Sequence, residues 1–535
     1  MSGTKISNRK IYRAILDKIV AGEFANDRDL TRVKLWACRE FGLKKFPRNS
    51  EILAVATDEE KDKVLQILRL KPIRSISGVY IITVMPKPYP CPKDEPCIYC
   101  PGGPSFNTPQ SYTGKEPAGR RAIENDFNPY QQVKSRIEQF RLMGHNVDKV
   151  ELIIFGGTIT AYPQKYLEGF VTQCLNAMSG ADAKTIEEAQ AAAENSSIRN
   201  SDITIETRPD HCKEPHIDLM LRLGTTRVEL GVQTVYDDIY KLVNREHTIE
   251  DVVEATRIAK DAGFSVIYHM MPGLLGSNYE RDLKAFEMIF QDSKFKPDAI
   301  KIYPTLIMPG TKLYQMWKRG EYKPYSFEKI VELIVEVKKH VPRWIRIQRI
   351  QRDIPSNLIA EGVKRGDLRL LVQKQLKQEG ASCQCIRCRE VGHVQYKSER
   401  KANPNDVKLI INKYQASEGE ELFLSYEDVK QDVLIGLLRL RRPSEKANRP
   451  ETKNLRSMLV RELHVFGPIV QVGSKAEVNE WQHRGWGESL MQNAEKISQE
   501  EFDAQKIIVL AGIGTRNYYR RFGYEREGPY MVKKI

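Results

Sequence analysis

The sequence predicts an α/β protein in which a partial (β/α) barrel is preceded by a small helical domain and followed by a mixed α/β domain. Three observations support this fold class. Residues 76–342 alternate short apolar runs with amphipathic segments, the chain beyond residue 401 contains runs typical of antiparallel strands, and the first 75 residues show helical periods. At 535 residues the chain exceeds what one hydrophobic core usually holds. The expected regions are 1–75, 76–342, 343–400 and 401–535.

The first region is expected to be helical and basic. An apolar stripe at helical spacing marks residues 8–22, and further helices are expected after Asp27 and over about 58–70. Residues 1–50 hold 12 Lys and Arg against 5 Asp and Glu, which is half of the formal net charge of +14. This charge favours a polyanionic partner, nucleic acid before membrane; the alternative is an ordinary solvated surface. The stripe consists of Ile11, Ile15, Leu16 and Ile19.

Nothing in the sequence predicts a membrane segment. No run of 18 or more apolar residues is present, and the first residues lack the apolar core of a secretion signal. Six of the nine cysteines fall in two tight groups, and the other three are scattered as buried thiols usually are. We therefore expect a cytoplasmic protein with no membrane partner.

Six βα repeats are expected within residues 76–342, which is the pattern of a parallel sheet covered by helices. Strands are predicted at 79–84, 150–155, 203–206, 227–231, 265–270 and 298–303. In such barrels the chemistry sits at the C-terminal ends of the strands. Residues of unusual type follow those ends, and we expect the following to bind a cofactor: Gly156, Gly157, Thr158, Glu206, Arg208, Gln233 and Lys301.

A polar, Pro-rich loop with three cysteines follows the first predicted strand. Cys91, Cys97 and Cys100 lie within ten residues, so closely that their thiolates repel one another unless a metal neutralises them. Zinc would need a fourth protein ligand, whereas an iron–sulfur cluster can be held by three thiolates with one iron left open. We therefore expect a [4Fe-4S] cluster here; three reduced structural cysteines are the alternative.

A second cysteine group lies in the region 343–400. Cys383, Cys385 and Cys388 have zinc-site spacing, and His393 is a candidate fourth ligand that would complete a tetrahedron. A half-buried structural histidine is the alternative for His393. A basic run precedes this group, with arginines at every third position from Arg343 to Arg352.

The C-terminal region resembles the GNAT acetyltransferases. A glycine loop, Arg484, Gly485, Trp486 and Gly487, opens a predicted helix, where exposed backbone amides bind pyrophosphate. In that family the loop binds coenzyme A, the preceding strand pairs with pantetheine, and a tyrosine often protonates the leaving thiolate. The resemblance thus implies acetyl-CoA, with Tyr518 or Tyr519 as the acid; core packing is the alternative for the tyrosines. The corresponding strand residues are Glu462, Leu463, His464 and Val465.

The barrel with its cysteine loop resembles the radical S-adenosylmethionine enzymes. In that family an open iron chelates the methionine moiety of S-adenosylmethionine, and one electron then cleaves the sulfonium to a 5′-deoxyadenosyl radical. The spacing here is Cys-x5-Cys-x2-Cys, against the usual Cys-x3-Cys-x2-Cys. The resemblance implies S-adenosylmethionine as a cofactor.

With both resemblances in one sequence, the chain is similar to one family, the catalytic subunit of Elongator in a free-standing, archaeal-type form. This resemblance covers nearly the whole chain and implies an enzyme that forms 5-carboxymethyluridine at wobble uridine 34 of tRNA from acetyl-CoA. The matching motifs include Ser111–Pro117, Gly156–Thr158, Ile205–Asp210, Glu229–Gln233, His269–Pro272, Lys301–Thr305, Arg461–Val465 and Gly528–Met531.

This family assignment leads to a radical mechanism as our hypothesis. Carbon C5 of uracil is a poor acceptor for ordinary acyl transfer, whereas a carbon radical formed on the acetyl methyl group can add to it. Lys149 matches a family lysine assigned to acetyl-CoA and is expected to gate the thioester; a surface salt bridge is its alternative. Basic residues in 1–50, in 343–352 and around Cys383–Cys388 are expected to hold the anticodon stem-loop of tRNA.

Two other functions remain open at this point. A protein lysine N-acetyltransferase with a structural iron–sulfur barrel would need a general base, for which Glu462 is the candidate. A tRNA-binding scaffold without chemistry is disfavoured by the intact cysteines and glycine loop. A homo-oligomer or accessory subunits are also left open. The main hypothesis requires that the C-terminal pocket can deliver its thioester to the barrel.

Overall fold

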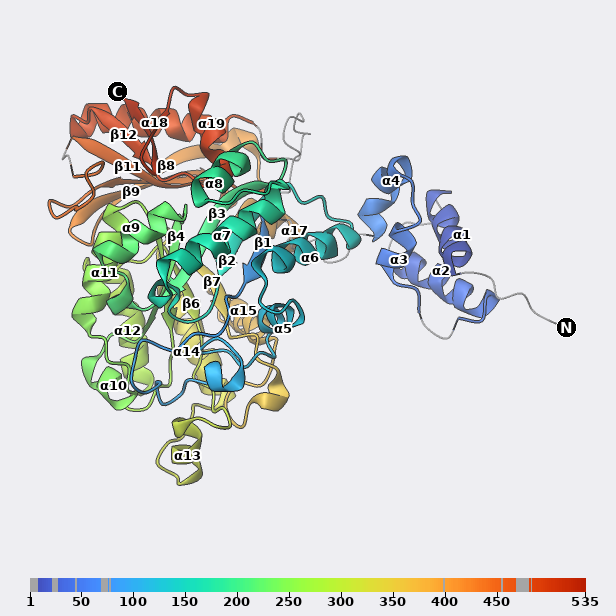
Figure 1. Ribbon diagram of the computed structural model, residues 1–535, viewed down its shortest axis with the longest axis horizontal. Coiled ribbons are helices and arrows are strands. Elements are labelled where there is room, and N and C mark those ends of the chain that lie inside the picture. The colour runs from blue at the N-terminus through green and yellow to red at the C-terminus, as the bar shows by residue number, and fades with distance from the viewer. Residues whose placement is uncertain are drawn as a thin grey trace.

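The computed structural model describes residues 8–21, 27–43, 46–68, 76, 78–397, 400–453, 456–467, 481–482 and 484–535. A unit of N-terminal helices lies beside a body with two seven-stranded sheets, one parallel and one mixed (Figure 1). Among these residues, no helix combines the length and the apolar character needed to cross a membrane.

The N-terminal unit contains four helices around a small apolar core. The predicted stripe is confirmed, since its four residues are all buried in that core. The short helix α3 was not predicted, because five residues are too few to show a helical period. The helices are α1 (Asn8–Val20), α2 (Asp27–Glu40), α3 (Asn49–Leu53) and α4 (Asp58–Leu68).

The first sheet is a parallel partial barrel whose seven strands follow one another in chain order. The six predicted strands are confirmed, but the sheet continues into a seventh, which lies within the segment we expected to be a basic linker. The strands are β1 (Tyr80–Val84), β2 (Lys149–Ile154), β3 (Arg199–Thr207), β4 (Arg227–Gln233), β5 (Ser265–Met270), β6 (Ala299–Ile302) and β7 (Arg346–Ile350).

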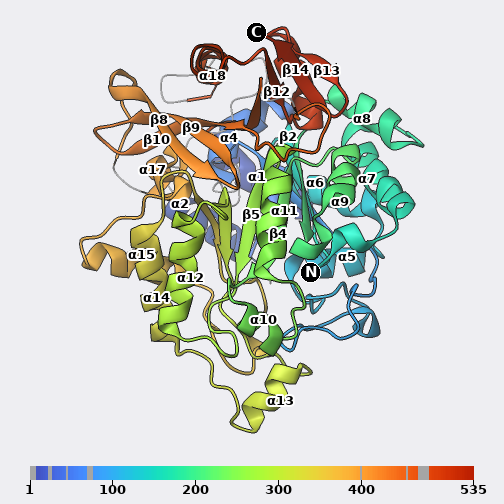
Figure 2. The same ribbon diagram turned by 90° about the vertical axis from the view of Figure 1, so that its left-hand side faces the viewer.

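Helices cover the outer face of this sheet (Figure 2). Those whose apolar residues join the barrel core are α6 (Pro129–Leu142), α7 (Gln164–Ser179), α8 (Ile186–Glu194), α9 (Glu214–Arg222), α11 (Ile249–Asp261), α12 (Tyr279–Gln291), α14 (Phe327–His340) and α15 (Leu368–Gln378). The helices α5 (Pro117–Glu124), α10 (Asp237–Leu242) and α13 (Lys312–Lys318) pack in smaller clusters, and α16 (Ile386–Arg389) and α17 (Val391–Lys397) contact the second sheet. On β2, Val150, Leu152 and Ile154 pack into the core beneath the helices. Because side chains alternate along a strand, Glu151 faces the inside of the barrel.

The second sheet is antiparallel except for the neighbouring pair β11 and β12, which run parallel. Its helix α18 covers a compact apolar core, so the expected mixed α/β domain is confirmed. The last two strands were not predicted, because they are short and one is fully exposed. The elements are β8 (Val407–Ala416), β9 (Gly419–Asp428), β10 (Val433–Arg442), β11 (Ser457–Val465), α18 (Trp486–Phe502), β12 (Lys506–Val509), α19 (Arg516–Arg520), β13 (Glu525–Glu527) and β14 (Tyr530–Lys534).

The second sheet packs against the N-terminal ends of the barrel strands. Arg461 on β11 forms ion pairs with Asp298, just before β6, at 2.7 Å, and with Glu421 on β9 at 2.8 Å. Arg441 on β10 pairs with Asp261 at the end of α11 at 2.6 Å. All of these side chains are buried, so the two sheets form one continuous body.

Candidate functional site

The three-cysteine loop that follows β1 lies at the end of the barrel remote from the second sheet. Cys97 is buried, and the side chains of Arg245 and Lys93 each lie 3.7 Å from its sulfur. Burial acts to raise the pKa of Cys97, but these two charges outweigh it and lower that pKa. A thiolate is the form that binds iron, so the loop is prepared for a metal centre.

The sulfurs of this loop are not gathered as tightly as the ligands of a single tetrahedral ion. Within the described part of the chain, Cys91, Cys97 and Cys100 are not a group whose ligand atoms all lie within 4.8 Å of one another. In a cluster each thiolate binds its own iron, which requires wider spacing than a single tetrahedral ion does. Cys100 accepts a hydrogen bond from Gln110 at 3.2 Å, and Ser111 Oγ lies 3.2 Å from the same sulfur.

A carboxylate lies between the glycine turn after β2 and the end of β3. Glu206 Oε2 accepts hydrogen bonds from the backbone amides of Gly156 and Gly157, each at 3.2 Å, and from Tyr112 Oη at 2.9 Å. Thr158 continues the turn and is also buried. The structure therefore brings four of the predicted cofactor residues together.

A second buried carboxylate lies beside a histidine on β5 and a lysine on β6. Glu229 on β4 accepts a hydrogen bond from Lys301 Nζ on β6 at 2.6 Å, and His269 Nε2 on β5 lies 2.6 Å from its other oxygen. Burial acts to raise the pKa of Glu229, but Lys301 and His269 lower it to about 2. Our sequence prediction included Lys301 but not Glu229 or His269. The sequence feature that could have indicated Glu229 and His269 was that both lie on predicted strands whose C-terminal ends meet at this site.

Several polar atoms at this end of the barrel have no protein partner. Arg208 forms an ion pair with Asp210, yet its Nη1 is buried without a hydrogen bond, as is Oε1 of Gln233. Gln233 also has a positive φ of 72°, a conformation that fixes its direction at the end of β4. Arg245 likewise leaves its Nε unpaired. Buried polar groups normally have partners, so these atoms fit a site for a polar ligand such as S-adenosylmethionine.

The glycine loop and one of the tyrosines meet at the second sheet. A Cβ added to Gly487 would lie 2.8 Å from Tyr518 Oη and 3.7 Å from Val465, so the loop, the end of β11 and α19 converge on one point. Gly485 has a φ of 82°, and Trp486 packs on the ring of Tyr426. Tyr519 instead lies in the apolar core of this domain. Of the two predicted tyrosines, Tyr518 is therefore the one at the loop.

The other predicted residues of this pocket have structural partners. Arg484 lies with its guanidinium over the ring of Trp481, His464 stacks on Phe466, and Leu463 packs against the apolar core. Glu462 forms an ion pair with Arg439 at 2.8 Å. Burial acts to raise the pKa of Glu462, but Arg439 and Arg227 lower it to about 2.

Lys149 is the first residue of β2, at the barrel end that faces the second sheet. It pairs in register with Arg199 on β3, whose backbone closely approaches Gly514, just ahead of α19. Its pKa is lowered by burial, with Asp148 acting in the opposite direction. Lys149 and Tyr518 are therefore on the same side of the molecule.

The two candidate sites lie at opposite ends of the barrel strands. Strand β3 has nine residues, which corresponds to a separation of roughly 25 Å. Charged side chains line the inner face between them: Arg227 at the start of β4 lies 3.4 Å from Glu462 and 3.3 Å from Asp202. Glu229 follows two residues later on the same face. Charged side chains therefore occupy the inner face of the barrel between the two sites.

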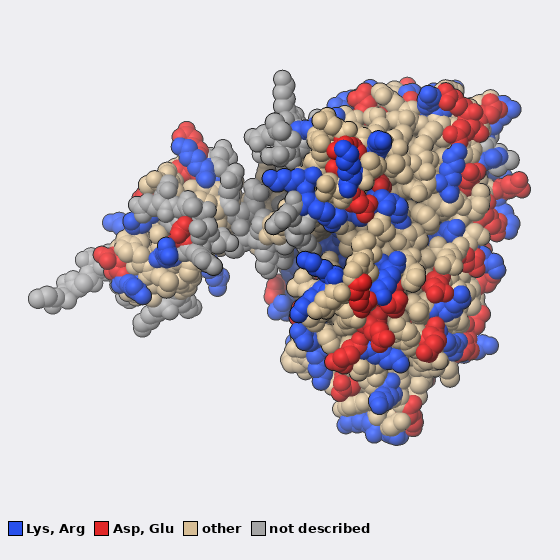
Figure 3. All heavy atoms as spheres, turned by 180° about the vertical axis from the view of Figure 1, so that it is seen from behind, with Lys and Arg blue, Asp and Glu red and all other residues tan. Residues whose placement is uncertain are grey.

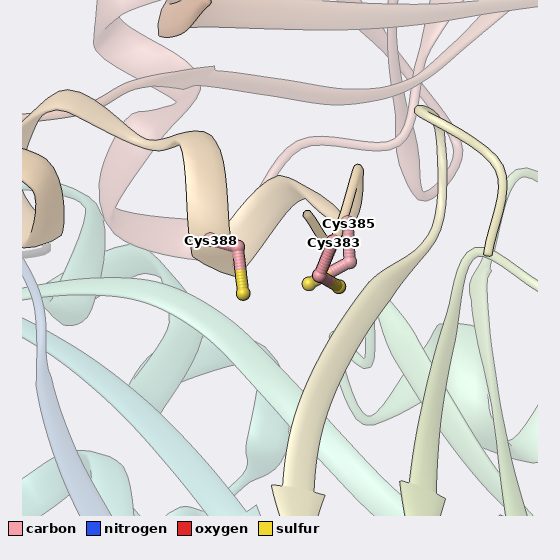
Figure 4. Close-up of side chains that lie close together, drawn as sticks. All are labelled: Cys383, Cys385 and Cys388. Atoms are coloured by element: carbon pink, nitrogen blue, oxygen red, sulfur yellow. The ribbon is translucent and has the colours of Figure 1, made fainter. Parts of the chain in front are cut away.

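The second cysteine group forms a compact site of its own. The sulfurs of Cys383, Cys385 and Cys388 lie within 4.8 Å of one another and point to the same side (Figure 4). Lys338 Nζ lies 3.5 Å from the sulfur of Cys388. The structure does not bring His393 into this group. Because α17 starts at Val391, it carries His393 away, and its Nε2 lies 2.9 Å from Glu390.

The arginines from Arg343 to Arg352 have partners within the chain. Arg343 pairs with Glu427 and Asp432, Arg346 with Glu390, and Arg352 donates to the carbonyl of Ser111. These contacts disfavour our expectation that this run binds RNA phosphates. Other Lys and Arg side chains line the edge of the body that faces the N-terminal helices (Figure 3).

Comparison with known proteins agrees with this architecture. A model of the ELP3 N-terminal domain matches residues 9–76, the radical SAM superfamily matches residues 90–289, and the Radical_SAM C-terminal domain matches residues 297–378. The chain is 48% identical over 532 residues to the tRNA uridine(34) acetyltransferase of Methanocaldococcus jannaschii, covering 98% of each chain.

Two further relatives support the same assignment. The chain is 44% identical over 542 residues to human Elongator complex protein 3, covering 100% of this chain and 98% of the relative. The structure of Methanocaldococcus infernus Elp3 with an N-terminal deletion superposes with a TM-score of 0.76 at 46% identity, covering 86% of this chain and 100% of that one. The chain therefore belongs to the family of Elongator complex protein 3 and the archaeal tRNA uridine(34) acetyltransferases.

Proposed function

We propose that this protein carboxymethylates C5 of wobble uridine 34 in tRNA, using S-adenosylmethionine and acetyl-CoA. One observation carries the proposal: the same continuous body holds two sites. The first is a three-cysteine loop beside buried polar groups that have no hydrogen-bond partner, and the second is a glycine loop that meets Tyr518. The names of the relatives, tRNA uridine(34) acetyltransferase and Elongator complex protein 3, support it.

Cys91, Cys97 and Cys100 would hold a [4Fe-4S] cluster, and Arg208 and Gln233 offer unpaired polar atoms to S-adenosylmethionine. With both groups bound, this site would supply one-electron cleavage of the sulfonium, which gives methionine and a 5′-deoxyadenosyl radical able to take hydrogen from the acetyl methyl group. Addition of the resulting carbon radical to C5, loss of one electron to the oxidised cluster and of the C5 proton, and hydrolysis of the thioester would then leave 5-carboxymethyluridine, 5′-deoxyadenosine and coenzyme A. The chain keeps Glu229 ionised beside Lys301 and His269, and fixes Glu206 on two backbone amides. These contacts hold the site in one arrangement before a ligand arrives.

The amides of the glycine loop would bind the pyrophosphate of acetyl-CoA at the start of α18. Tyr518 would donate a proton to the departing thiolate, and Lys149 would contact the thioester. Because the acetyl group is carried on a long flexible arm, we propose that it reaches the radical site through the polar barrel interior past Arg227. The hypothesis fails if distance or a wall of packed side chains keeps the thioester from the radical site, and the ion-paired side chains of Arg227, Asp202 and Glu462 would have to let the arm pass.

We propose that the basic N-terminal helices hold tRNA, so that binding weakens as salt rises. The group Cys383, Cys385 and Cys388 is proposed to bind zinc in a structural role. Three thiolates leave one coordination position to be filled.

A protein lysine N-acetyltransferase is the weaker candidate. That reaction needs a base with a pKa near the working pH, and Glu462 was the residue available for it. With its pKa lowered to about 2 and an ion pair to Arg439, Glu462 is a poor acceptor for a proton.

The test is an anaerobic incubation of the reconstituted protein with S-adenosylmethionine, dithionite, acetyl-CoA and tRNA, followed by mass spectrometry of nucleosides. We expect 5-carboxymethyluridine and 5′-deoxyadenosine. Protein with an intact cluster that yields no modified uridine would refute the proposal. Acetylation of a basic peptide in place of tRNA would favour the alternative.

A further inference from the structure

Four aromatic rings form a continuous ladder beside the cysteine loop. Tyr89 packs on Tyr162 with ring centroids 4.7 Å apart, Tyr162 stacks on Tyr166 at 5.7 Å, and Tyr166 packs on Phe170 at 6.2 Å. Tyr89 lies between the end of β1 and Cys91, and Tyr162 lies beyond the end of β2. The ladder therefore starts at the barrel end that carries the cluster loop.

The ladder is buried at one end and open at the other. Tyr162 is 6% exposed and Phe170 is 3% exposed, whereas Tyr89 is 38% exposed. One face of the Tyr89 ring is thus covered by Tyr162, while much of the rest contacts solvent. The Tyr89 ring is therefore accessible to a ligand and is backed by the buried rings behind it.

The hydroxyl groups of the inner rings hold the chain in place. Tyr162 Oη donates to the carbonyl of Lys87 at 3.0 Å, and the amide of Lys87 donates to Tyr166 Oη at 2.9 Å. These bonds fix the segment that carries Tyr89, and the side chain of Lys87 remains exposed beside it. A preorganised aromatic surface next to a cation suits a flat, uncharged ring attached to a phosphate.

We propose that Tyr89 is a stacking platform for an unpaired base of the RNA substrate, with the aromatic ladder as its support and Lys87 contacting the adjoining phosphate. The inference rests on the proposed function. Bases that leave their helical stack commonly pack on aromatic side chains, and this does not require a particular base because every base has a π-face. The target uridine must leave its stack to reach the cluster end of the barrel, which exposes its neighbours at this position.

The test compares Tyr89→Ala, Tyr89→Phe and Lys87→Ala in the full-length protein, with Tyr396→Ala as the control. Tyr396 on α17 is 51% exposed and lies at the other end of the barrel, against β10. Binding of a fluorescent anticodon stem-loop RNA is measured over a range of salt concentrations, and thermal melting checks that each variant is folded.

We expect Tyr89→Ala to raise Kd about tenfold with an unchanged salt slope, because it removes stacking but no phosphate contact. Tyr89→Phe keeps the ring and binds as the wild type does. Lys87→Ala lowers the salt slope by about one, and Tyr396→Ala changes neither quantity. Equal Kd values for Tyr89→Ala and wild type would overturn the platform while leaving the proposed function intact.

A second measurement does not depend on variants. Photo-crosslinking of a bromouridine-substituted stem-loop to wild-type protein should label the peptide that contains Tyr89. Labelling confined to other peptides would contradict the platform. A wild-type protein that binds no tRNA at all would overturn both the platform and the proposed function.

Discussion

At the residue scale, one feature of the barrel has a clear energetic consequence: the carboxylate of Glu229 stays ionised while fully buried. Glu229 is 1% exposed, and its charge is balanced by Lys301 and His269. Removing one member of such a group leaves the others uncompensated, which usually costs more than the intact group contributes.

We predict that Glu229→Gln destabilises the protein by about 3 kcal/mol and weakens S-adenosylmethionine binding. Urea unfolding measures the first effect and titration calorimetry the second. The pKa of Glu229 is lowered to about 2 from an ordinary 4.5, so its stabilisation is complete above pH 4.5 and is lost as the pH falls toward 2. The variant should lack that part of the acid sensitivity.

A matched control is Glu287→Gln on α12, where Glu287 forms an exposed pair with Lys284 at 3.1 Å. Its effect should stay within about 0.5 kcal/mol. Equal effects of the two substitutions would show that burial of the Glu229 group is not what stabilises the barrel.

A second prediction concerns the glycine that touches Tyr518. Gly487→Ala places a methyl group 2.8 Å from Tyr518 Oη and should weaken acetyl-CoA binding about tenfold by displacing that hydroxyl. Adding Tyr518→Phe removes the clashing atom and should restore most of the binding, measured by calorimetry. Gly169→Ala, on α7 with open space around its Cβ, should leave binding unchanged. Failure of the double variant to recover would mean that another contact fixes Gly487.

Also at the residue scale, sequence motifs could predict the chemistry that a residue supports but not the side chains that it contacts. Cysteine spacing led to both cysteine groups, and a glycine loop led to the pocket at Tyr518. The same reasoning placed His393 with the cysteines, although α17 turns it toward Glu390. It also named Glu229 and His269 within family motifs but gave them no role in the site, because a carboxylate within an apolar strand becomes informative only when its neighbours are known.

At the element scale, long apolar runs could be predicted and short or charged strands could not. The sequence of β7 resembles a basic linker, because its two apolar residues, Ile347 and Ile350, lie three positions apart between arginines and show no strand alternation, although both pack into the barrel core. Those arginines are not free for RNA, since Arg346 pairs with Glu390 across the linker. Strand β7 thus forms one edge of the sheet, and it also holds the segment that carries Cys383, Cys385 and Cys388.

The two cysteine groups should bind different metals, so a substitution in one group should remove one metal and leave the other in place. We predict that Cys388→Ala loses zinc and keeps iron and sulfide, because the group 383–388 is compact and suits one tetrahedral ion. Cys97→Ala should lose iron and keep zinc. Metal analysis of anaerobically purified protein measures both, with Cys212→Ala, a buried cysteine outside both groups, as the control. Loss of both metals from either variant would indicate one shared site.

At the scale of the whole molecule, the arrangement of the two sites depends on a contact that no single motif records. The sequence predicts each domain, but only the fold shows that the second sheet packs at the N-terminal ends of the barrel strands, opposite the cysteine loop. Buried charges on both sides make this contact specific, because a shifted arrangement would leave Asp298 or Arg461 without a partner. Under the proposed function, the acetyl group would therefore have to travel the length of the barrel strands from one site to the other.

The last prediction tests whether this contact holds the molecule together. Arg461→Ala removes the cation that bridges Asp298 and Glu421 and leaves these buried carboxylates to Lys260, Arg439 and Arg441, so we expect a loss of about 3 kcal/mol in urea unfolding. The exposed pair of Lys413 and Glu501 supplies the control, since Lys413→Ala should cost less than about 1 kcal/mol. Burial acts to raise the pKa values of Asp298 and Glu421, but Arg461 and Lys260 lower both. Their stabilisation is therefore complete above about pH 4.5 and is lost below it, so wild-type protein should unfold in acid as one body. Separate acid transitions for the barrel and the second sheet would show that the domains are held together by something other than these charges.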